Sequence, residues 1–236
     1  PEWSPDGSLI AYCGYIEENN VGWGTENMEL WVCDPKTGTA RSLTAKTDYC
    51  LVAIALGDSA EASFAPAIRW TPNSKFLLFS VGWHGSRTVM SITRSGRNLQ
   101  EELGGRSCWE MGNISGDCIS LLGQSATDPP ELFAGSFTKT TIKPTQVTSC
   151  NAGFKKKYTI ARPQSTWITA EDGHRVHTWI MRPPMRKSSR RGPGILQIHG
   201  GPHGMYGYSF FHEFQCQAAA GYTIYYANPR GSKGYG

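Results

Sequence analysis

The stretch Ile195-Leu196-Gln197-Ile198-His199-Gly200-Gly201-Pro202-His203-Gly204 is the most informative part of the sequence. It joins a short apolar run, typical of a strand, to a loop that contains three glycines. Paired glycines at the carboxyl end of a strand adopt backbone conformations that other residues avoid, so a main-chain N–H can point into an unobstructed cleft. The sequence therefore predicts a strand followed by a loop that can stabilise negative charge on a reacting carbonyl oxygen.

A helix and a second strand are predicted after this loop. Phe211, Phe214 and Ala218 have helical spacing within residues 210–220, and Gly221 is expected to end the helix. The apolar run 222–227 is the next predicted strand. Strand, glycine loop, helix and strand form one α/β unit, in which the two strands are expected to pair in parallel.

A β-hairpin is predicted before the glycine loop. Asp172-Gly173 lies between the runs 167–171 and 174–181, a pattern that favours a two-residue turn. His174 and His177 are three residues apart on the second strand, so they are expected on opposite faces, at the surface, and unable to chelate a metal together. The basic, proline-containing stretch 182–193 is predicted to be a solvated linker rather than a nucleic-acid-binding patch.

The first two thirds of the chain repeat a strand-turn-strand pattern. Trp3-Ser4-Pro5-Asp6-Gly7 precedes the apolar run 9–12, and Trp70-Thr71-Pro72-Asn73-Ser74 precedes the run 76–79. Proline and a following Asp or Asn favour a tight turn. A further strand, turn and strand are predicted at 29–33, 34–38 and 40–44, and residues 89–93 with the turn 94–96 repeat them in part.

A third, degenerate copy has its turn at 113–117 and strands at 118–122 and 131–138. Pro72 and Ser115 are 43 residues apart, within the roughly 40 to 50 residues of one four-stranded propeller blade. The first copy is longer, and the extra residues are expected within 17–26 or 48–64. Residues 1–150 are therefore predicted to form about three blades of a β-propeller, too few to close a ring.

Residues 151–236 are predicted to form the N-terminal part of an α/β-hydrolase domain. In that fold the loop after the third strand supplies an N–H to the oxyanion hole from a His-Gly-Gly type motif; a plain surface turn is the alternative for Gly200-Gly201-Pro202. No serine has glycine two residues before and two after it, so the chain contains no Gly-x-Ser-x-Gly motif. Nucleophile, acid and base are expected to follow Gly236, in a longer protein of which this chain is an internal and, by itself, inactive piece.

Two other kinds of site fit these residues less well. His212-Glu213-Phe214-Gln215-Cys216 has a cysteine where a zinc peptidase has its second histidine, so no metal site is predicted. A dinucleotide-binding loop needs Gly-x-Gly-x-x-Gly and an acidic residue after the next strand; here the glycines are spaced differently, Pro202 lacks an N–H and Ala227-Asn228-Pro229 carries no acid. No cofactor is predicted.

Composition narrows the class of protein. Hydrophobic residues make up 39% and charged residues 18% of the chain, a balance that excludes a highly charged disordered chain and a coiled coil. No apolar run approaches the length of a membrane span, and the net charge of +4 is too mild to indicate nucleic-acid binding. Seven widely spaced cysteines without a Cys-x-x-Cys pair argue against a disulfide framework and favour the cytoplasm.

Together these motifs resemble the prolyl oligopeptidase family of serine peptidases, and most of all its acylaminoacyl-peptidase or dipeptidyl-peptidase-like branch. The resemblance is weak in the repeats and more specific in residues 195–236, where the glycine loop precedes Asn228-Pro229-Arg230-Gly231-Ser232-Lys233-Gly234-Tyr235-Gly236. It implies a propeller, usually of seven blades, that caps an α/β-hydrolase domain and admits short peptides. It also implies hydrolysis through an acyl-enzyme without metal or organic cofactor.

The resemblance assigns roles to six residues. The backbone N–H of Gly201 would bind the oxyanion, with Gly200 shaping the loop. His199, Pro202, Asn228 and Arg230 would line the active site, with His199 as wall or support because other branches have a tyrosine there. Arg230 is expected to be a structural, hydrogen-bonded residue. A non-catalytic propeller binding protein and a carboxylesterase of the same fold stay open as alternatives.

Overall fold

The computed structural model describes residues 1–15, 26–52, 55–59, 66–138, 141–184, 192–201 and 203–235. Strands in three sheets make up nearly half of this part of the chain, and two short helices are the other regular elements described there. The first two sheets come from the first 146 residues and the third sheet from the remainder.

The first sheet is an antiparallel meander of four strands in the order β1-β2-β3-β4. Its strands are β1 (Glu2–Trp3), β2 (Ile10–Gly14), β3 (Glu29–Cys33) and β4 (Ala40–Ser42). Long connections follow β2 and β4, where the sequence predicts extra residues, but parts of both lie outside the described residues. The apolar residues of this unit pack with those of the next one, β5 to β7, in a single core cluster.

The second sheet contains two further four-stranded units. The first comprises β5 (Ile68–Trp70), β6 (Phe76–Trp83), β7 (Ser86–Thr93) and β8 (Gln100–Leu103). The second comprises β9 (Cys108–Ser115), β10 (Cys118–Ser125), β11 (Asp128–Thr138) and β12 (Thr141–Gln146). Within each unit all consecutive strands pair antiparallel. The last strand of the first unit, β8, does not pair with the first strand of the second, β9; the two units join instead through one parallel pair, Arg87 of β7 with Cys108 of β9.

The predicted turns form through the same bonds in the first and second units. Ser4 N–H donates to the Leu9 carbonyl at 2.8 Å, and Thr71 N–H donates to the Phe76 carbonyl at 2.9 Å. In both turns a side-chain oxygen accepts a local N–H, at Asp6 in one and at Asn73 in the other. In the third unit the prediction is partly wrong: residues 113–115 belong to β9, because Ile114 pairs with Ile119 and strand pairing continues up to the turn.

The third sheet has the order β13-β14-β16-β15, and only β15 and β16 pair in parallel, as predicted. Its strands are β13 (Pro163–Thr169), β14 (Arg175–Met181), β15 (Gly194–Gln197) and β16 (Thr223–Asn228), with α2 (His212–Ala219) between β15 and β16. The two-residue turn predicted between β13 and β14 is wrong. Ala170 N–H donates to the His174 carbonyl, so residues 171–173 form a three-residue loop.

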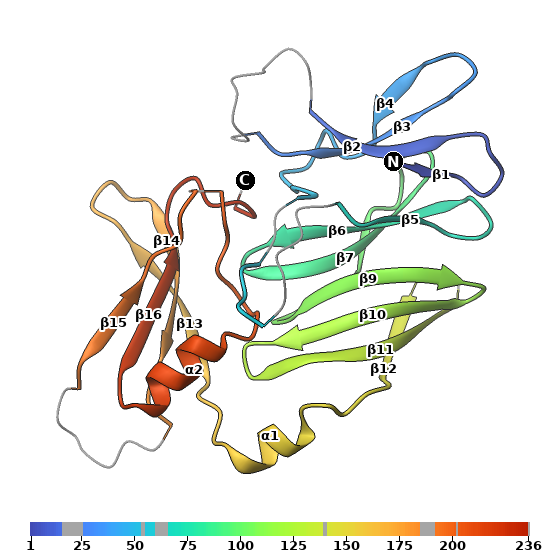
Figure 1. The fold of residues 1–236 in the computed structure, drawn as a ribbon. Helices are drawn as coiled ribbons and strands as arrows, with labels where there is room; N and C mark the ends of the chain where they lie inside the picture. The colour runs from blue at the N-terminus through green and yellow to red at the C-terminus, as the bar shows by residue number, and fades with distance from the viewer. Residues whose placement is uncertain are drawn as a thin grey trace.

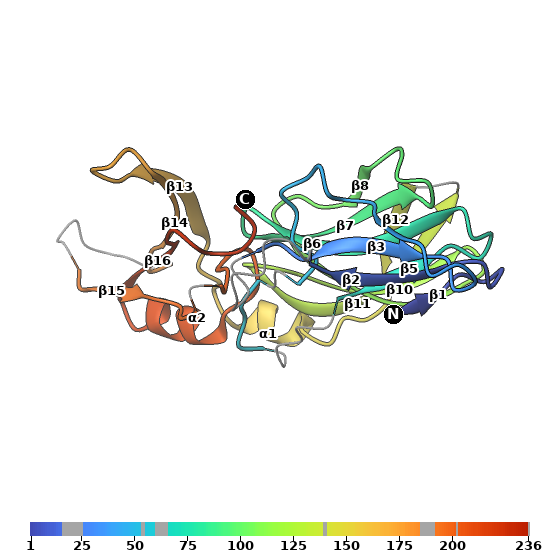
Figure 2. The same ribbon diagram turned by 90° about the horizontal axis from the view of Figure 1, so that it is seen from above.

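Figures 1 and 2 show how these parts are arranged. The third sheet lies beside the two N-terminal sheets, and α1 (Ala152–Lys157) joins β12 to β13 along one edge. The C-terminus lies between the third sheet and the N-terminal sheets in both views. The loops at the carboxyl ends of β15 and β16 therefore meet the N-terminal sheets.

Helix α2 covers one face of the third sheet. Phe214 and Ala218 of α2 are buried in one cluster with Trp179, Ile224 and Tyr226. On the other face, Leu196 of β15 is 64% exposed and its neighbour Tyr225 of β16 is 40% exposed.

Neither helix in the described residues has the length and hydropathy that crossing a bilayer requires. All seven cysteines lie in the described ranges, and none of them forms a disulfide there. The cytoplasmic location stays a prediction.

Candidate active site

The glycine loop follows the carboxyl end of β15, the edge of the sheet where the sequence analysis expects it. Gly200 and Gly201 are exposed, and the chain is buried again from Met205 onward. Pro202, which was predicted to line the site, lies outside the described residues. The loop is thus an exposed bend between the buried His199 and the buried residues that begin at Met205.

Gly201 has a backbone conformation that requires glycine. Its φ is +119°, and a Cβ atom there would lie 2.5 Å from the His203 nitrogen. Within the described residues the Gly201 N–H donates no hydrogen bond. Gly200 does not have a positive φ, and a Cβ atom there would meet nothing within 4 Å. The predicted role of Gly200 in shaping the loop stays a prediction.

His199 is buried and held by hydrogen bonds. Its Nε2 lies 3.1 Å from Asn228 Oδ1 and 3.2 Å from Ser232 Oγ, and its Nδ1 lies 3.1 Å from the Gly200 carbonyl oxygen. Ser232 Oγ donates to the Pro229 carbonyl, so toward the histidine it is an acceptor. Nε2 therefore carries a hydrogen, and this hydrogen is engaged within the protein. The role of His199 as wall or support of an active site stays a prediction.

Asn228 ends β16 and is buried. Besides His199, its side chain binds the backbone of Tyr206 and the hydroxyl of Tyr235. Arg230, two residues later, forms an ion pair with Asp172 in the β13–β14 turn, and both side chains are more than half exposed. The arginine is thus hydrogen-bonded to a neighbouring turn. Whether Asn228 and Arg230 line an active site stays a prediction.

His177 is only 4% exposed, so the prediction that it lies at the surface is wrong. Its ring stacks on the Trp167 ring, with the two centroids 4.4 Å apart, and the centroid of the Trp179 ring lies 3.9 Å from that of His177. Nδ1 and Nε2 lie 2.7 Å from Tyr235 Oη and Ser165 Oγ respectively. Burial lowers the pKa of His177 to about 4.

The turn between β6 and β7 contacts this end of the third sheet. The His84 ring stacks on the Tyr235 ring with centroids 5.2 Å apart, and the backbone N–H of His84 donates to the Gly234 carbonyl at 3.0 Å. Gly85 accepts a hydrogen bond from Tyr208 N–H at 2.8 Å. Neither His84 nor Gly85 was predicted from the sequence; the nearest signal was the stretch Asn228 to Gly236, on which the family resemblance partly rests.

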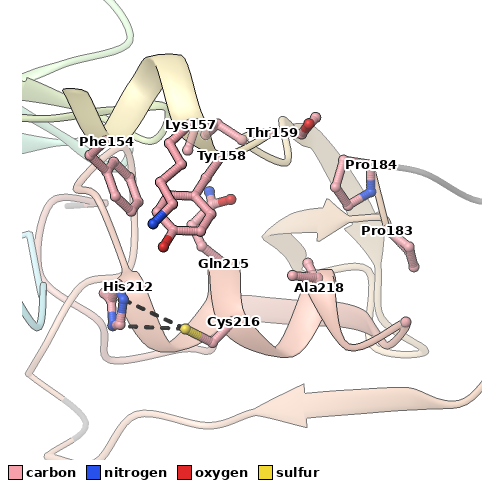
Figure 3. Close-up of a pocket in the computed structure, with 13 residues that line it drawn as sticks. Phe154, Lys157, Tyr158, Thr159, Pro183, Pro184, His212, Gln215, Cys216 and Ala218 are labelled. Atoms are coloured by element: carbon pink, nitrogen blue, oxygen red, sulfur yellow. Dashed lines mark hydrogen bonds between the residues drawn. The ribbon is translucent and has the colours of Figure 1, made fainter. Parts of the chain in front are cut away.

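Three grooves in the described part of the chain have volumes of about 910, 520 and 420 Å³. They are lined by α1, α2 and the β9–β12 unit, and not by the glycine loop. In the 910 Å³ groove, His212 and Cys216 of α2 face each other, with Sγ 3.6 Å from Nε2 (Figure 3). No group of three potential metal ligands occurs in the described residues.

No protein-family profile matches the chain. It is 32% identical over 209 residues to the uncharacterized peptidase YuxL of Bacillus subtilis (strain 168), covering 88% of this chain and 31% of that protein. It is 23% identical over 238 residues to dipeptidyl-peptidase 5 of Porphyromonas gingivalis, covering 100% of this chain and 32% of that protein. The structure resembles an acylaminoacyl peptidase solved in complex with Z-Gly-Gly-Phe-chloromethyl ketone, with a TM-score of 0.76 and 26% identity over 98% of this chain and 32% of that one.

The chain belongs to the prolyl oligopeptidase family of serine peptidases. It spans about a third of the length of the relatives that it matches. The described part of the chain includes Gly200 and Gly201 of the glycine loop and the hydrogen-bonded side chains of His199 and Asn228 beside them.

Proposed function

We propose that the protein containing this chain is a serine peptidase that hydrolyses short peptides through an acyl-enzyme. In this proposal a serine outside the chain attacks the carbonyl carbon of the scissile bond, and negative charge develops on the carbonyl oxygen. The Gly201 N–H donates a hydrogen bond to that oxygen. Stabilisation of this kind acts in the transition state and therefore raises the rate of the chemical step.

The observation that carries the proposal is the conformation of Gly201. The residue is exposed at the carboxyl end of β15, at a positive φ, with an N–H that makes no hydrogen bond within the described residues. Both ends of the loop are buried and hydrogen-bonded, so the N–H is held in advance of substrate binding. A donor fixed in this way loses little energy to reorganisation during reaction.

The proposal includes a domain assignment. The three four-stranded units of residues 1–150 are blades of a β-propeller, and residues 151–236 begin an α/β-hydrolase domain. Consecutive antiparallel strands within the units and the parallel β15–β16 pair around α2 support this assignment. Sheets with parallel strands are covered on both faces in α/β proteins, so the exposed Leu196 and Tyr225 fit a domain whose other elements cover that face.

The proposed substrates are acylaminoacyl or dipeptidyl peptides. The names of the relatives, dipeptidyl-peptidase and acylaminoacyl peptidase, support this class, and so does the peptide chloromethyl ketone named with the solved structure. The propeller blades are proposed to restrict entry to short peptides.

The full-length protein tests the proposal directly. We expect it to release the chromophore from an N-acetyl-aminoacyl anilide or a dipeptidyl anilide, and to be labelled by a fluorophosphonate probe, which reacts with activated serines. Hydrolysis of esters without any peptide hydrolysis would indicate a carboxylesterase instead. Neither hydrolysis nor labelling would indicate a non-catalytic binding protein and overturn the proposal.

The Gly201→Ala variant tests the assigned atom. The Cβ atom would lie 2.5 Å from the His203 nitrogen and displace the N–H, so we expect kcat to fall by about 100- to 1,000-fold, as when one oxyanion donor is removed. Gly116→Ala is the matched control, because Gly116 also has a positive φ, +56°, but lies in the β9–β10 turn with open space around it. Equal kcat values in the two variants would contradict the role of Gly201.

A further inference from the structure

The side chain of Asn228 makes four hydrogen bonds, all to groups beside the glycine loop. Oδ1 accepts from Tyr206 N–H at 2.8 Å and from His199 Nε2–H at 3.1 Å. Nδ2 donates to the Tyr206 carbonyl at 2.8 Å and to Tyr235 Oη at 2.7 Å. Two accepted and two donated bonds use the full capacity of a side-chain amide, and Asn228 is only 3% exposed.

These bonds fix both ends of the loop. His199 is the last residue before the glycines, and Tyr206 is where the chain has become buried again. The carboxamide pairs with both backbone groups of Tyr206, as the backbone of an adjacent strand would. A single side chain on β16, an inner strand of the third sheet, therefore fixes the distance between His199 and Tyr206, the two ends of the exposed bend.

The orientation of His199 depends on the same side chain. Nε2–H is directed toward Asn228 Oδ1 and Ser232 Oγ, which places Nδ1 next to the Gly200 carbonyl. The peptide bond that carries this carbonyl also carries the N–H of Gly201. The His199 imidazole therefore packs against the peptide group that carries the proposed oxyanion donor, and its orientation affects where that peptide group can lie.

We propose that Asn228 is a positioning residue for the Gly201 N–H and so contributes to catalysis without touching the substrate. This inference rests on the proposed function, because it concerns the same N–H. It differs from the predicted active-site lining in that the side chain has no bonding capacity left for a ligand. Its contribution is to the geometry of the loop.

The test compares Asn228→Ala with Gln215→Ala in the full-length protein. Gln215 of α2 is buried and binds both backbone groups of one residue, Ala161, so its removal costs similar bonds away from the loop. We expect Asn228→Ala to lower kcat by about 10- to 100-fold with KM nearly unchanged, the loss expected from a small displacement of a catalytic group. Gln215→Ala is expected to lower the melting temperature but to keep the wild-type kcat.

Hydrogen exchange provides a second readout that does not depend on activity. We expect peptides covering residues 199–206 to exchange about tenfold faster or more in Asn228→Ala and at the wild-type rate in Gln215→Ala. Asn228→Asp keeps both accepted bonds and loses both donated ones, so it should rescue part of the kcat. Its exchange rate should likewise be intermediate.

The outcomes separate this inference from the proposed function. Unchanged exchange in Asn228→Ala, or faster exchange with a wild-type kcat, would overturn the positioning role while the peptidase activity stands. A similar loss of kcat in Gln215→Ala would also overturn it, because the effect would then reflect general stability. If the wild-type protein neither hydrolyses peptides nor reacts with a fluorophosphonate, the proposed function fails, and the positioning role fails with it.

Discussion

At the scale of single residues, the end of the third sheet is organised by a directional chain of hydrogen bonds. Asn228 Nδ2–H donates to Tyr235 Oη, so the Tyr235 hydroxyl hydrogen is directed to His177 Nδ1. His177 Nε2–H then donates to Ser165 Oγ. This order leaves His177 neutral, in agreement with its lowered pKa, and it connects the support of the glycine loop to the aromatic cluster around Trp167.

His177 should make the stability of the protein depend on pH. In the folded state burial lowers its pKa from 6.5 to about 4. As the pH falls from 6.5 toward 4, the unfolded chain binds a proton that the folded protein does not, so stability is lost across this window. We expect His177→Phe, which keeps a ring between Trp167 and Trp179, to show a smaller decrease in melting temperature between pH 7 and pH 5 than the wild type.

The control for this prediction is His174→Gln. His174 is exposed in the β13–β14 loop, so its replacement should leave the pH dependence as in the wild type. Restricting the comparison to pH 5 and above keeps it clear of most carboxylate titration. A wild-type pH dependence in His177→Phe would show that the proton uptake occurs elsewhere.

These residues also show what sequence reasoning can reach. The predicted position of the loop with Gly201 follows from neighbouring residues alone, because an apolar strand and a glycine pair are local signals. The burial of His177 depends on Trp167 from the neighbouring strand and on Tyr235, 58 residues further along the chain. Strand alternation predicts on which face a residue lies, but it does not predict what covers that face.

At the scale of elements, helix α2 is held at its N-terminus by a distant aspartate. The helix has eight residues, and its N-cap residue, Phe211, provides no side-chain hydrogen bond. Asp58 replaces it: its carboxylate oxygens accept from His212 N–H at 2.8 Å and from Glu213 N–H at 2.7 Å. A negative charge is favourable at this end of a helix, so the segment 55–59 stabilises the element that covers the third sheet.

Removing this distant cap should destabilise the protein. We expect Asp58→Ala to lower the free energy of unfolding by about 0.5 to 2 kcal/mol, the usual cost of losing an N-cap side chain. Asp58→Asn keeps one acceptor oxygen and should lose less. Denaturant unfolding measures both, with Asp117→Ala, an exposed turn residue in the β9–β10 connection, as the control that should match the wild type.

The elements themselves are largely predictable, and the differences have identifiable causes. The strands at 29–33 and 76–79, the helix after the glycine loop and the parallel pair β15–β16 agree with the sequence patterns. The two-residue turn at Asp172-Gly173 is wrong because backbone pairing stops at Ala170 and His174 and leaves three residues between them. The Asp58 cap could not be predicted, since no local pattern links a loop to a helix that starts 154 residues later.

At the scale of the whole molecule, the N-terminal sheets and the third sheet meet through backbone contacts. In the β6–β7 turn, the backbone N–H of His84 donates to the Gly234 carbonyl, and the Gly85 carbonyl accepts from the backbone N–H of Tyr208. Lys233 Nζ crosses the same junction to the carbonyl of Glu26 at 2.6 Å, and burial lowers the pKa of this lysine. Contacts that fix backbone to backbone leave little freedom for sliding, so we infer that the junction supports the loops at the candidate active site.

Gly207→Ala should break this junction. A Cβ atom at Gly207 would overlap the carbonyl group of Gly85. Gly85 has little room to move away, because the Trp179 ring lies only 2.6 Å from the position that a Cβ atom of Gly85 would take. We expect an apparent loss of stability of about 1 to 3 kcal/mol, typical of overpacking, and a melting transition that broadens or splits as the two parts unfold separately.

Gly153→Ala is the matched control, because Gly153 lies inside α1 with nothing within 4 Å of an added Cβ atom. There the substitution should be neutral or stabilise by about 0.5 to 1 kcal/mol, since alanine favours the helix. Calorimetry on the full-length protein measures both variants, and limited proteolysis of the connection between α1 and β13 reports whether the parts have separated. A single wild-type transition in Gly207→Ala would mean that the contact between Gly85 and Gly207 is not what couples the N-terminal sheets to the glycine loop.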